Sequence, residues 1–186
     1  DEDPTATTTP VPEENASTES LEDPRYSGLG PGTSVGISST ARTGTFFSGV
    51  IKLEDEEGEE IPVYCIDLYH NLNASELYPR TWDELKNIVK PPDYPEEITD
   101  EEWNRLAWIL TQHSPSTSLS PEEAAAVQVA IWKVLFDATA DDPNIEARAQ
   151  EIANETPPAG WKPFQGDPDL TIQPTTATLE PGDSQT

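Results

Sequence analysis

Residues 120–139 read SPEEAAAVQVAIWKVLFDAT, and this stretch predicts a buried, central helix. Ser120 is a typical N-cap, Pro121 suits the first helical position, and Glu123 completes the start signal. The residues that follow are apolar on nearly every side of a helix, whereas a surface helix keeps one polar face. We therefore expect the rest of the domain to pack around this helix.

The segments before this helix change from strand patterns to helix patterns. Residues 33–53 are rich in β-branched and aromatic side chains punctuated by glycine, which predicts two strands. An acidic turn at 54–60 leads to a third strand at 61–68, whose side chains alternate between the two faces of a sheet. Capping-box patterns at Thr81 and Thr99 then open two helices.

After the central helix, Asp142 and Pro143 open a further helix, and a strand pattern returns at 168–173. Strands, then helices, then a strand indicate an α+β fold rather than a wound parallel sheet. We expect a sheet part of sandwich or barrel-like form, about 30–70 and 165–173, with an inserted helical subdomain at about 80–156.

The two ends of the chain differ from the middle in composition. Residues 1–24 are acidic, lack basic residues and are rich in Thr, Ser and Pro, so they cannot bury enough surface to fold and should form a disordered linker. Residues 174–186 are similar and should be a linker or the start of a stalk. The folded domain then spans 25–173, as one module of a longer exported protein. No signal-peptide pattern opens the chain, so we expect a mature form or an excised piece.

Charge and composition exclude several classes of function. The chain has 186 residues with 36 acidic against 10 basic side chains, a formal charge of −26. Such a chain is a poor ligand for nucleic acid or anionic membranes, and no apolar run is long enough to span a bilayer. The acidic runs at 54–60 and 93–102 lack the spacing of a calcium loop and should be solvated. We expect no metal or cofactor.

Cys65 and Gln128 are the two residues that invite a chemical interpretation. Cys65 is the single cysteine, so it has no disulfide partner in the chain; it is either a small buried hydrophobe or a reactive group. Gln128 lies in the most apolar helical stretch, where an unpaired carboxamide costs roughly 1–3 kcal/mol. The simpler interpretation is a Gln128 side chain hydrogen-bonded to a loop backbone.

The two residues also fit one another chemically. A cysteine sulfur can attack a glutamine carboxamide, expel ammonia and leave an internal thioester. A dry, apolar surrounding suits this product because it excludes the water that would hydrolyse it. Amines open such a bond and form a stable amide, so the reaction occurs once per molecule.

The surrounding motifs resemble a known family. Tyr64-Cys65-Ile66-Asp67 and the helix motif from Gln128 to Trp132, with the stretch 104–110 before it, look like the thioester domains of Gram-positive surface adhesins. The resemblance spans roughly 30–155. It implies that Cys65 and Gln128 supply the two halves of the bond.

The resemblance also implies a location and a partner. The full-length protein would be extracellular, anchored to the bacterial cell wall, and would react with a lysine on a host surface or matrix protein. It would be a self-reactive module rather than a turnover enzyme, and we expect a monomer without membrane insertion in this segment.

Two alternatives remain open from the residues alone. A Cys-dependent enzyme, protease or transglutaminase-like, would pair Cys65 with His70 or His113 as base, although a surface histidine is the simpler interpretation of His113. A passive binding module would leave Cys65 inert. Tyr64, Asp67, His70 and Trp132 are possible neighbours of the thioester; Trp132 could cover it or belong to the core.

Overall fold

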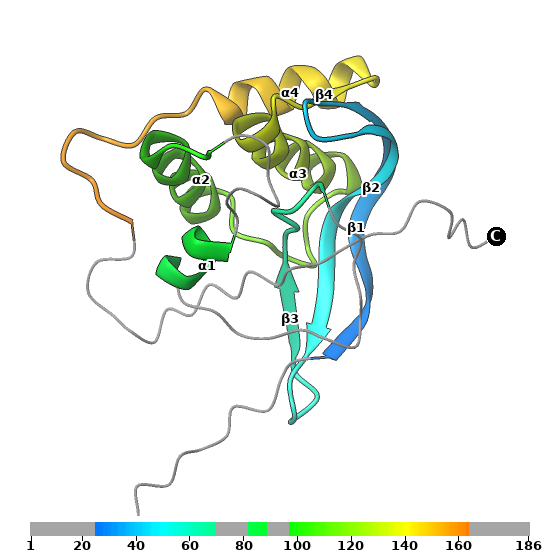
Figure 1. Ribbon diagram of the computed structural model, residues 1–186. Helices are drawn as coiled ribbons and strands as arrows, with labels where there is room; N and C mark the ends of the chain where they lie inside the picture. The colour runs from blue at the N-terminus through cyan, green and yellow to red at the C-terminus, as the bar shows by residue number, and fades with distance from the viewer. Residues whose placement is uncertain (1–24, 70–81, 89–96, 164–186) are drawn as a thin grey trace, which may run out of the picture.

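The computed structural model describes residues 25–69, 82–88 and 97–163, which form an antiparallel sheet packed against helices (Figure 1). In chain order the elements are β1 (Arg25–Ser38), β2 (Thr43–Glu54), β3 (Glu60–Val63), α1 (Trp82–Ile88), α2 (Asp100–Gln112), α3 (Pro121–Phe136), β4 (Thr139–Ala140) and α4 (Pro143–Ala153). The expected α+β class is confirmed.

The sheet has the strand order β3-β2-β1-β4, with every neighbouring pair antiparallel. The long hairpin of β1 and β2 forms its centre, and its register shifts twice in the first half of β1. At the second shift Gly32 pairs with Gly49. A Cβ atom on Gly32 would lie 2.5 Å from the carbonyl oxygen of Ser48, so the two strands approach too closely there for a side chain.

The sandwich or barrel form that we expected is absent from the described part of the chain. One open sheet is present, and α3 rather than a second sheet packs on β1 and β2. The apolar helix therefore supplies the surface that the strands need for burial. The predicted strand at 168–173 and the cap at Thr81 lie outside the described residues.

Two strand boundaries differ from the prediction, and one short strand was not predicted. β1 begins at Arg25 instead of residue 33, because pairing with β2 holds a glycine-rich segment extended despite its weak strand propensity. β3 ends at Val63 instead of residue 68. The short β4 lies within the segment predicted as helical, and it pairs with Ile37 and Ser38 of β1.

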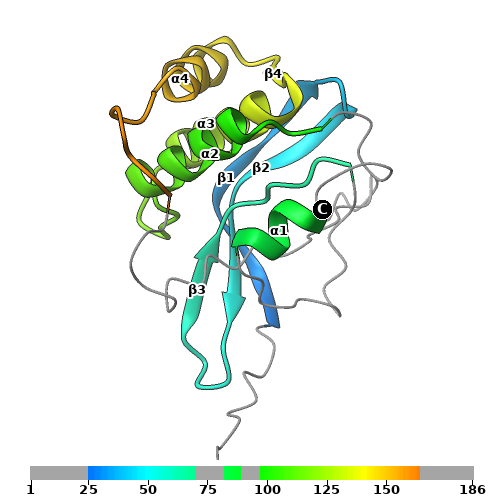
Figure 2. The ribbon, with the colours of Figure 1, turned by 60° about the vertical axis from the view of Figure 1, so that its left-hand side comes forward.

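The predicted helix starts are confirmed at three helices. Thr99 forms a capping box with Glu102 at α2, Ser120 caps α3, and Asp142 caps α4. α3 ends at Phe136 rather than at residue 139, because Asp137 adopts a left-handed conformation with φ of 51°. Figure 2 shows α2, α3 and α4 on the same side of the sheet; α3 packs on both other helices and on β1 and β2.

The acidic turn between β2 and β3 is confirmed as a hairpin connection. Oδ1 of Asp55 accepts hydrogen bonds from the backbone N–H groups of Glu57 and Glu59, at 3.0 and 2.8 Å. The Asp55 carboxylate thus closes the turn.

No helix within the described ranges has the length and apolar character of a membrane span.

Candidate functional site

Gln128 lies near the middle of α3, with only 1% of its surface exposed. The helix is covered on several sides because it packs on β1, β2, α2 and α4. The apolar pattern of the sequence produces this burial, since every neighbour of α3 covers one side of it. The carboxamide is therefore held in a dry interior, as predicted.

Cys65 lies directly opposite this carboxamide, although the two residues are 63 positions apart. Its backbone N–H donates to Oε1 of Gln128 at 2.9 Å. In return Nε2 of Gln128 donates to the carbonyl oxygen of Cys65 at 2.5 Å. Just beyond the end of β3, the backbone of Cys65 is thus hydrogen-bonded to the side chain of Gln128 instead of to a neighbouring strand. The simpler interpretation of Gln128, a side chain hydrogen-bonded to a loop backbone, therefore describes these contacts, and the loop is the one that carries the thiol.

The thiol of Cys65 is buried, with 2% of the residue exposed. Sγ donates a hydrogen bond to the backbone carbonyl of Asp67 at 3.1 Å. Burial, and after it the negative charge of Asp67, raise the pKa of Cys65 to about 12, against the lowering effect of that hydrogen bond. The sulfur is therefore a neutral thiol at physiological pH. A cysteine hydrolase must form the thiolate in every turnover, so it needs a thiol pKa lowered into the physiological range.

This arrangement suits acyl transfer between the two side chains. If Sγ adds to Cδ of Gln128, negative charge develops on Oε1, where the N–H of Cys65 already donates. A fixed backbone donor at this position stabilises the developing oxyanion. The nitrogen that would leave as ammonia is held by the carbonyl oxygen of Cys65. One residue therefore orients both the acyl oxygen and the leaving group.

A comparison with protein families identifies the chain. The family model described as Thioester domain matches residues 62–157. This chain belongs to the thioester domain family. The match includes Cys65, Gln128 and the helices α2 to α4, and it leaves β1 and β2 outside. The resemblance drawn from the motifs is confirmed. A search of curated proteins and a search of solved structures found no match.

Two of the predicted neighbours flank the pair in the thioester domain. Tyr64 precedes Cys65 and is 7% exposed; its hydroxyl has no partner within the described residues. Burial, and secondarily the charge of Glu123, raise the pKa of Tyr64. Trp132, one turn after Gln128, is 1% exposed and meets Phe46 edge-on with ring centroids 6.4 Å apart. Trp132 is thus part of the core, and its role as a cover for the thioester stays a prediction.

His113 gives the enzyme alternative little support. Nε2 of His113 pairs with the carboxylate of Glu155 at 2.8 Å, at the C-terminal end of α2. That ring nitrogen is therefore engaged with a residue beyond α4. His70 lies outside the described residues, so its predicted place beside Cys65 stays a prediction.

Asp67 is a neighbour whose part the sequence did not reveal. The residue is 2% exposed, and its Oδ1 accepts a hydrogen bond from the N–H of Tyr69 at 2.8 Å. An aspartate bonded to the backbone two residues ahead forms an Asx turn. The spacing from Asp67 to Tyr69 is the signal in the sequence, but such turns are common, and only the fold places this one against the thiol.

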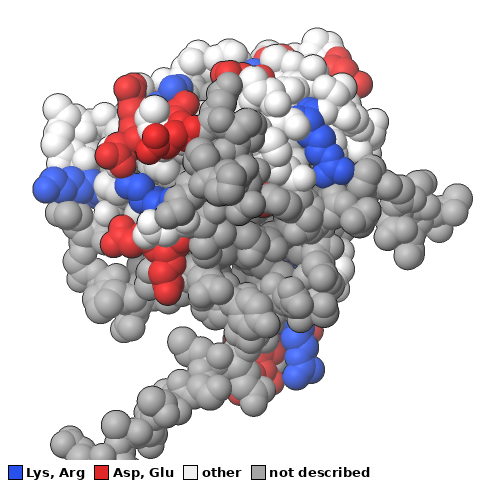
Figure 3. Space-filling view, in the orientation of Figure 1, with Lys and Arg blue, Asp and Glu red and all other residues white. Residues whose placement is uncertain are grey.

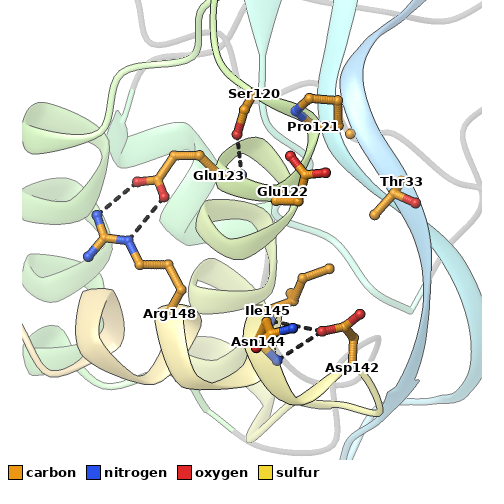
Figure 4. Close-up of a pocket in the computed structure, with 10 residues that line it drawn as sticks. Thr33, Ser120, Pro121, Glu122, Glu123, Asp142, Asn144, Ile145 and Arg148 are labelled. Carbon is orange, nitrogen blue, oxygen red and sulfur yellow. Dashed lines mark hydrogen bonds and ion pairs between the residues drawn. The ribbon is translucent and has the colours of Figure 1, made fainter.

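A separate pocket of about 410 Å³ lies at the first turns of α3 and α4 (Figure 4). Its lining includes neither Cys65 nor Gln128. Glu123 and Arg148 form a two-point ion pair there, at 2.8 and 3.0 Å, and Asp142 accepts from the backbone of α4. The charged groups of the pocket are thus largely paired with one another and stabilise the contact between the two helices.

Proposed function

We propose that this thioester domain is the reactive module of a bacterial surface adhesin, in which Cys65 and Gln128 form an internal thioester that attaches covalently to an amine. The observation that carries the proposal is the pair of hydrogen bonds between the Gln128 carboxamide and the Cys65 backbone. They hold the buried Gln128 carboxamide against the backbone of the buried cysteine, which supports a reaction between the two side chains. The extracellular, wall-anchored setting follows from the family resemblance.

The bond would form by transfer of the Gln128 acyl group to sulfur. The Sγ–H bond of Cys65 breaks, an Sγ–Cδ bond forms, and the Cδ–Nε2 bond breaks. The thiol proton leaves on nitrogen, so one ammonia is released. No turnover follows, because the acyl group stays on the protein.

Attachment would then use the thioester as an electrophile. The nitrogen of a lysine side chain on a host surface protein adds to Cδ of Gln128, and the Cδ–Sγ bond breaks. The sulfur recovers a proton from the attacking nitrogen, which leaves a stable amide and the Cys65 thiol. Each molecule reacts once, so the module is a single-use coupling device rather than an enzyme.

The surface charge supports a basic partner. Acidic side chains gather over α1 and α2 (Figure 3), where both helices begin with acidic residues. The whole chain carries a formal charge of −26. A field of this sign attracts lysine-bearing surfaces and speeds their encounter at low salt.

Intact mass spectrometry tests the proposal directly. The thioester form should be lighter than its sequence by one ammonia and should resist alkylation at Cys65. Methylamine should then add to Gln128 and expose the thiol to alkylation. The control is Cys65→Ala, which should show the full mass and incorporate no methylamine.

The same measurement separates the alternatives. A chain of full mass with a thiol that alkylates rapidly at neutral pH would favour a Cys-dependent enzyme. A chain of full mass with an inert thiol would favour a passive binding module. Either result would reject the thioester.

A further inference from the structure

The segment that follows β3 holds the sulfur of Cys65 through a turn made by one carboxylate. Oδ1 of Asp67 accepts from the N–H of Tyr69 at 2.8 Å. This Asx turn fixes the backbone of Asp67, and its carbonyl oxygen accepts from Sγ of Cys65 at 3.1 Å. The side chain of Asp67 therefore orients the sulfur indirectly, through its own backbone.

The same side chain places a negative charge beside the sulfur. Asp67 is 2% exposed and Cys65 is 2% exposed, so little water separates or screens them. Charges interact more strongly in such a surrounding than in water. Of the described charged groups, Asp67 is the one that raises the pKa of the Cys65 thiol, whereas Glu123 acts on the adjacent Tyr64.

This charge matters at the moment when the thioester opens. An amine or a water molecule adds to Cδ of Gln128, the Cδ–Sγ bond breaks, and the electron pair of that bond leaves on sulfur. The sulfur is then a thiolate until it takes the proton of the attacking group. A thiol with a high pKa leaves more slowly than one with a low pKa. A buried carboxylate beside Sγ therefore opposes opening.

We propose that Asp67 is a positioning residue that sets how the thioester forms and how long it lasts: its turn positions the Cys65 thiol before the bond forms, and its charge opposes release of the sulfur as an anion when the bond opens. The inference rests on the proposed function, since it concerns the opening of the Cys65–Gln128 bond. It explains how a reactive electrophile persists until a partner amine arrives.

The substitution Asp67→Asn separates charge from turn. The asparagine side chain keeps an oxygen that accepts from the N–H of Tyr69 but carries no charge. The variant should still be one ammonia lighter than its sequence. It should react with methylamine at least about threefold faster than the wild type, because a neighbouring charge shifts a pKa by about 1–3 units and thiol leaving rates depend partly on that pKa. The opening rate is read from intact mass over time.

A second readout reports the charge directly. In the methylamine-opened form, the thiolate absorbance of Asp67→Asn should titrate at lower pH than that of the wild type, with an unchanged melting temperature. Glu56→Gln is the matched control, because it removes one exposed acidic charge from the turn between β2 and β3. It should open at the wild-type rate. Asp67→Ala lacks both turn and charge and should contain less thioester.

The outcomes distinguish this inference from the proposed function. A wild-type chain of full mass would reject the proposed function and the inference with it. A wild type with the thioester and an Asp67→Asn variant that opens at the wild-type rate would reject the inference alone. If Asp67→Asn does not fold, Asp67→Ser keeps an acceptor oxygen for Tyr69 and replaces it in the test. Loss of folding in both variants would assign Asp67 to fold stability and overturn the inference.

Discussion

At the scale of single residues, Gln128 has two properties that rarely coincide. It is a buried amide with both ends of its carboxamide hydrogen-bonded, and it is the acyl donor of the proposed reaction. Because both bonds go to the backbone of Cys65, the residue that satisfies the amide is the residue that carries the nucleophile. The contacts that satisfy the buried amide of α3 therefore also bring together the two residues of the proposed bond.

Truncation of Gln128 should cost more stability than truncation of Cys65. Gln128→Ala and Cys65→Ala both abolish the cross-link, but Gln128→Ala also removes two buried hydrogen bonds to the backbone of Cys65. We expect Gln128→Ala to be less stable than Cys65→Ala by about 2–4 kcal/mol. Guanidinium denaturation of both variants measures the difference. Equal stabilities would mean that the two hydrogen bonds contribute nothing.

The thiol should also make the opened form sensitive to alkali. The pKa of Cys65 is raised from its ordinary value of 9.0 to about 12 in the folded chain. The folded state therefore keeps a proton that the unfolded state loses. Stability should be undiminished below about pH 9 and should fall between there and about pH 12, by at most about 1.4 kcal/mol per pH unit.

The measurement is the denaturation midpoint of methylamine-treated protein against pH. Cys65→Ala is the control, and the slope of the wild type should exceed its slope over this range. Tyr64 has a raised pKa in both proteins, so its contribution cancels in the comparison. Identical slopes would show that the thiol is solvated.

Cys65 and Gln128 could be identified from the sequence because each of them is conspicuous by itself. A lone cysteine and an amide in an apolar helix are visible in any reading of the chain. Their mode of contact was not predictable, because it depends on where β3 stops relative to α3. The positioning role of the turn at Asp67 was missed for the same reason. The bond from Asp67 to Tyr69 is local in sequence, but the Cys65 sulfur meets the Asp67 carbonyl only in the folded chain.

At the scale of the elements, α3 was predictable because its signals are local. The side-chain oxygen of Ser120 accepts from the N–H of Glu123 at 3.1 Å, as the sequence implied. Helix caps act within one turn, so they do not depend on the remainder of the fold.

Removal of this cap should weaken the fold without affecting the reactive pair. Ser120→Ala should lower the free energy of unfolding by about 1 kcal/mol. The mass deficit of one ammonia should persist, because Gln128 lies about two turns beyond the cap. Urea denaturation and intact mass are measured together. Thr117→Ala, at an exposed position before the helix, is the control; an equal loss in both variants would contradict the role of the cap.

The strand ends were less predictable than the helix starts because their causes are distant in sequence. β3 ends at Val63, and two residues later the Gln128 side chain rather than another strand binds the backbone at Cys65. β4 exists because the left-handed Asp137 ends α3 and turns the chain toward β1. Neither event leaves a pattern near the strand that it affects.

At the scale of the whole molecule, the thioester would join the edge of the sheet to the central helix. A cross-link between residues 63 apart restricts the unfolded chain, by about 4 kcal/mol on the model used for disulfides. Methylamine treatment should therefore lower the melting temperature, by roughly 10 °C. Scanning calorimetry before and after treatment tests this. Cys65→Ala should show no change on treatment, and a treated wild type that melts no lower would contradict the prediction.

The class of fold was predictable at this scale, and the form of the sheet was not. Strands followed by helices indicate α+β whatever the detailed contacts, and the sheet and helices agree with that order. The form of a sheet depends on what covers its faces. In the described residues α3 covers the central strands, so an open sheet suffices where we expected a sandwich or barrel.

The central position of α3 has a mechanical consequence for an attached module. A host protein bound as an amide at Gln128 would pull on the middle of α3, not on a strand or a loop. Because α3 packs on β1, β2, β4, α2 and α4, the tension would be shared among all of these contacts at once. Rupture would then require the core to shear as a unit, whereas an attachment on an edge strand would let the sheet unzip one pair of hydrogen bonds at a time.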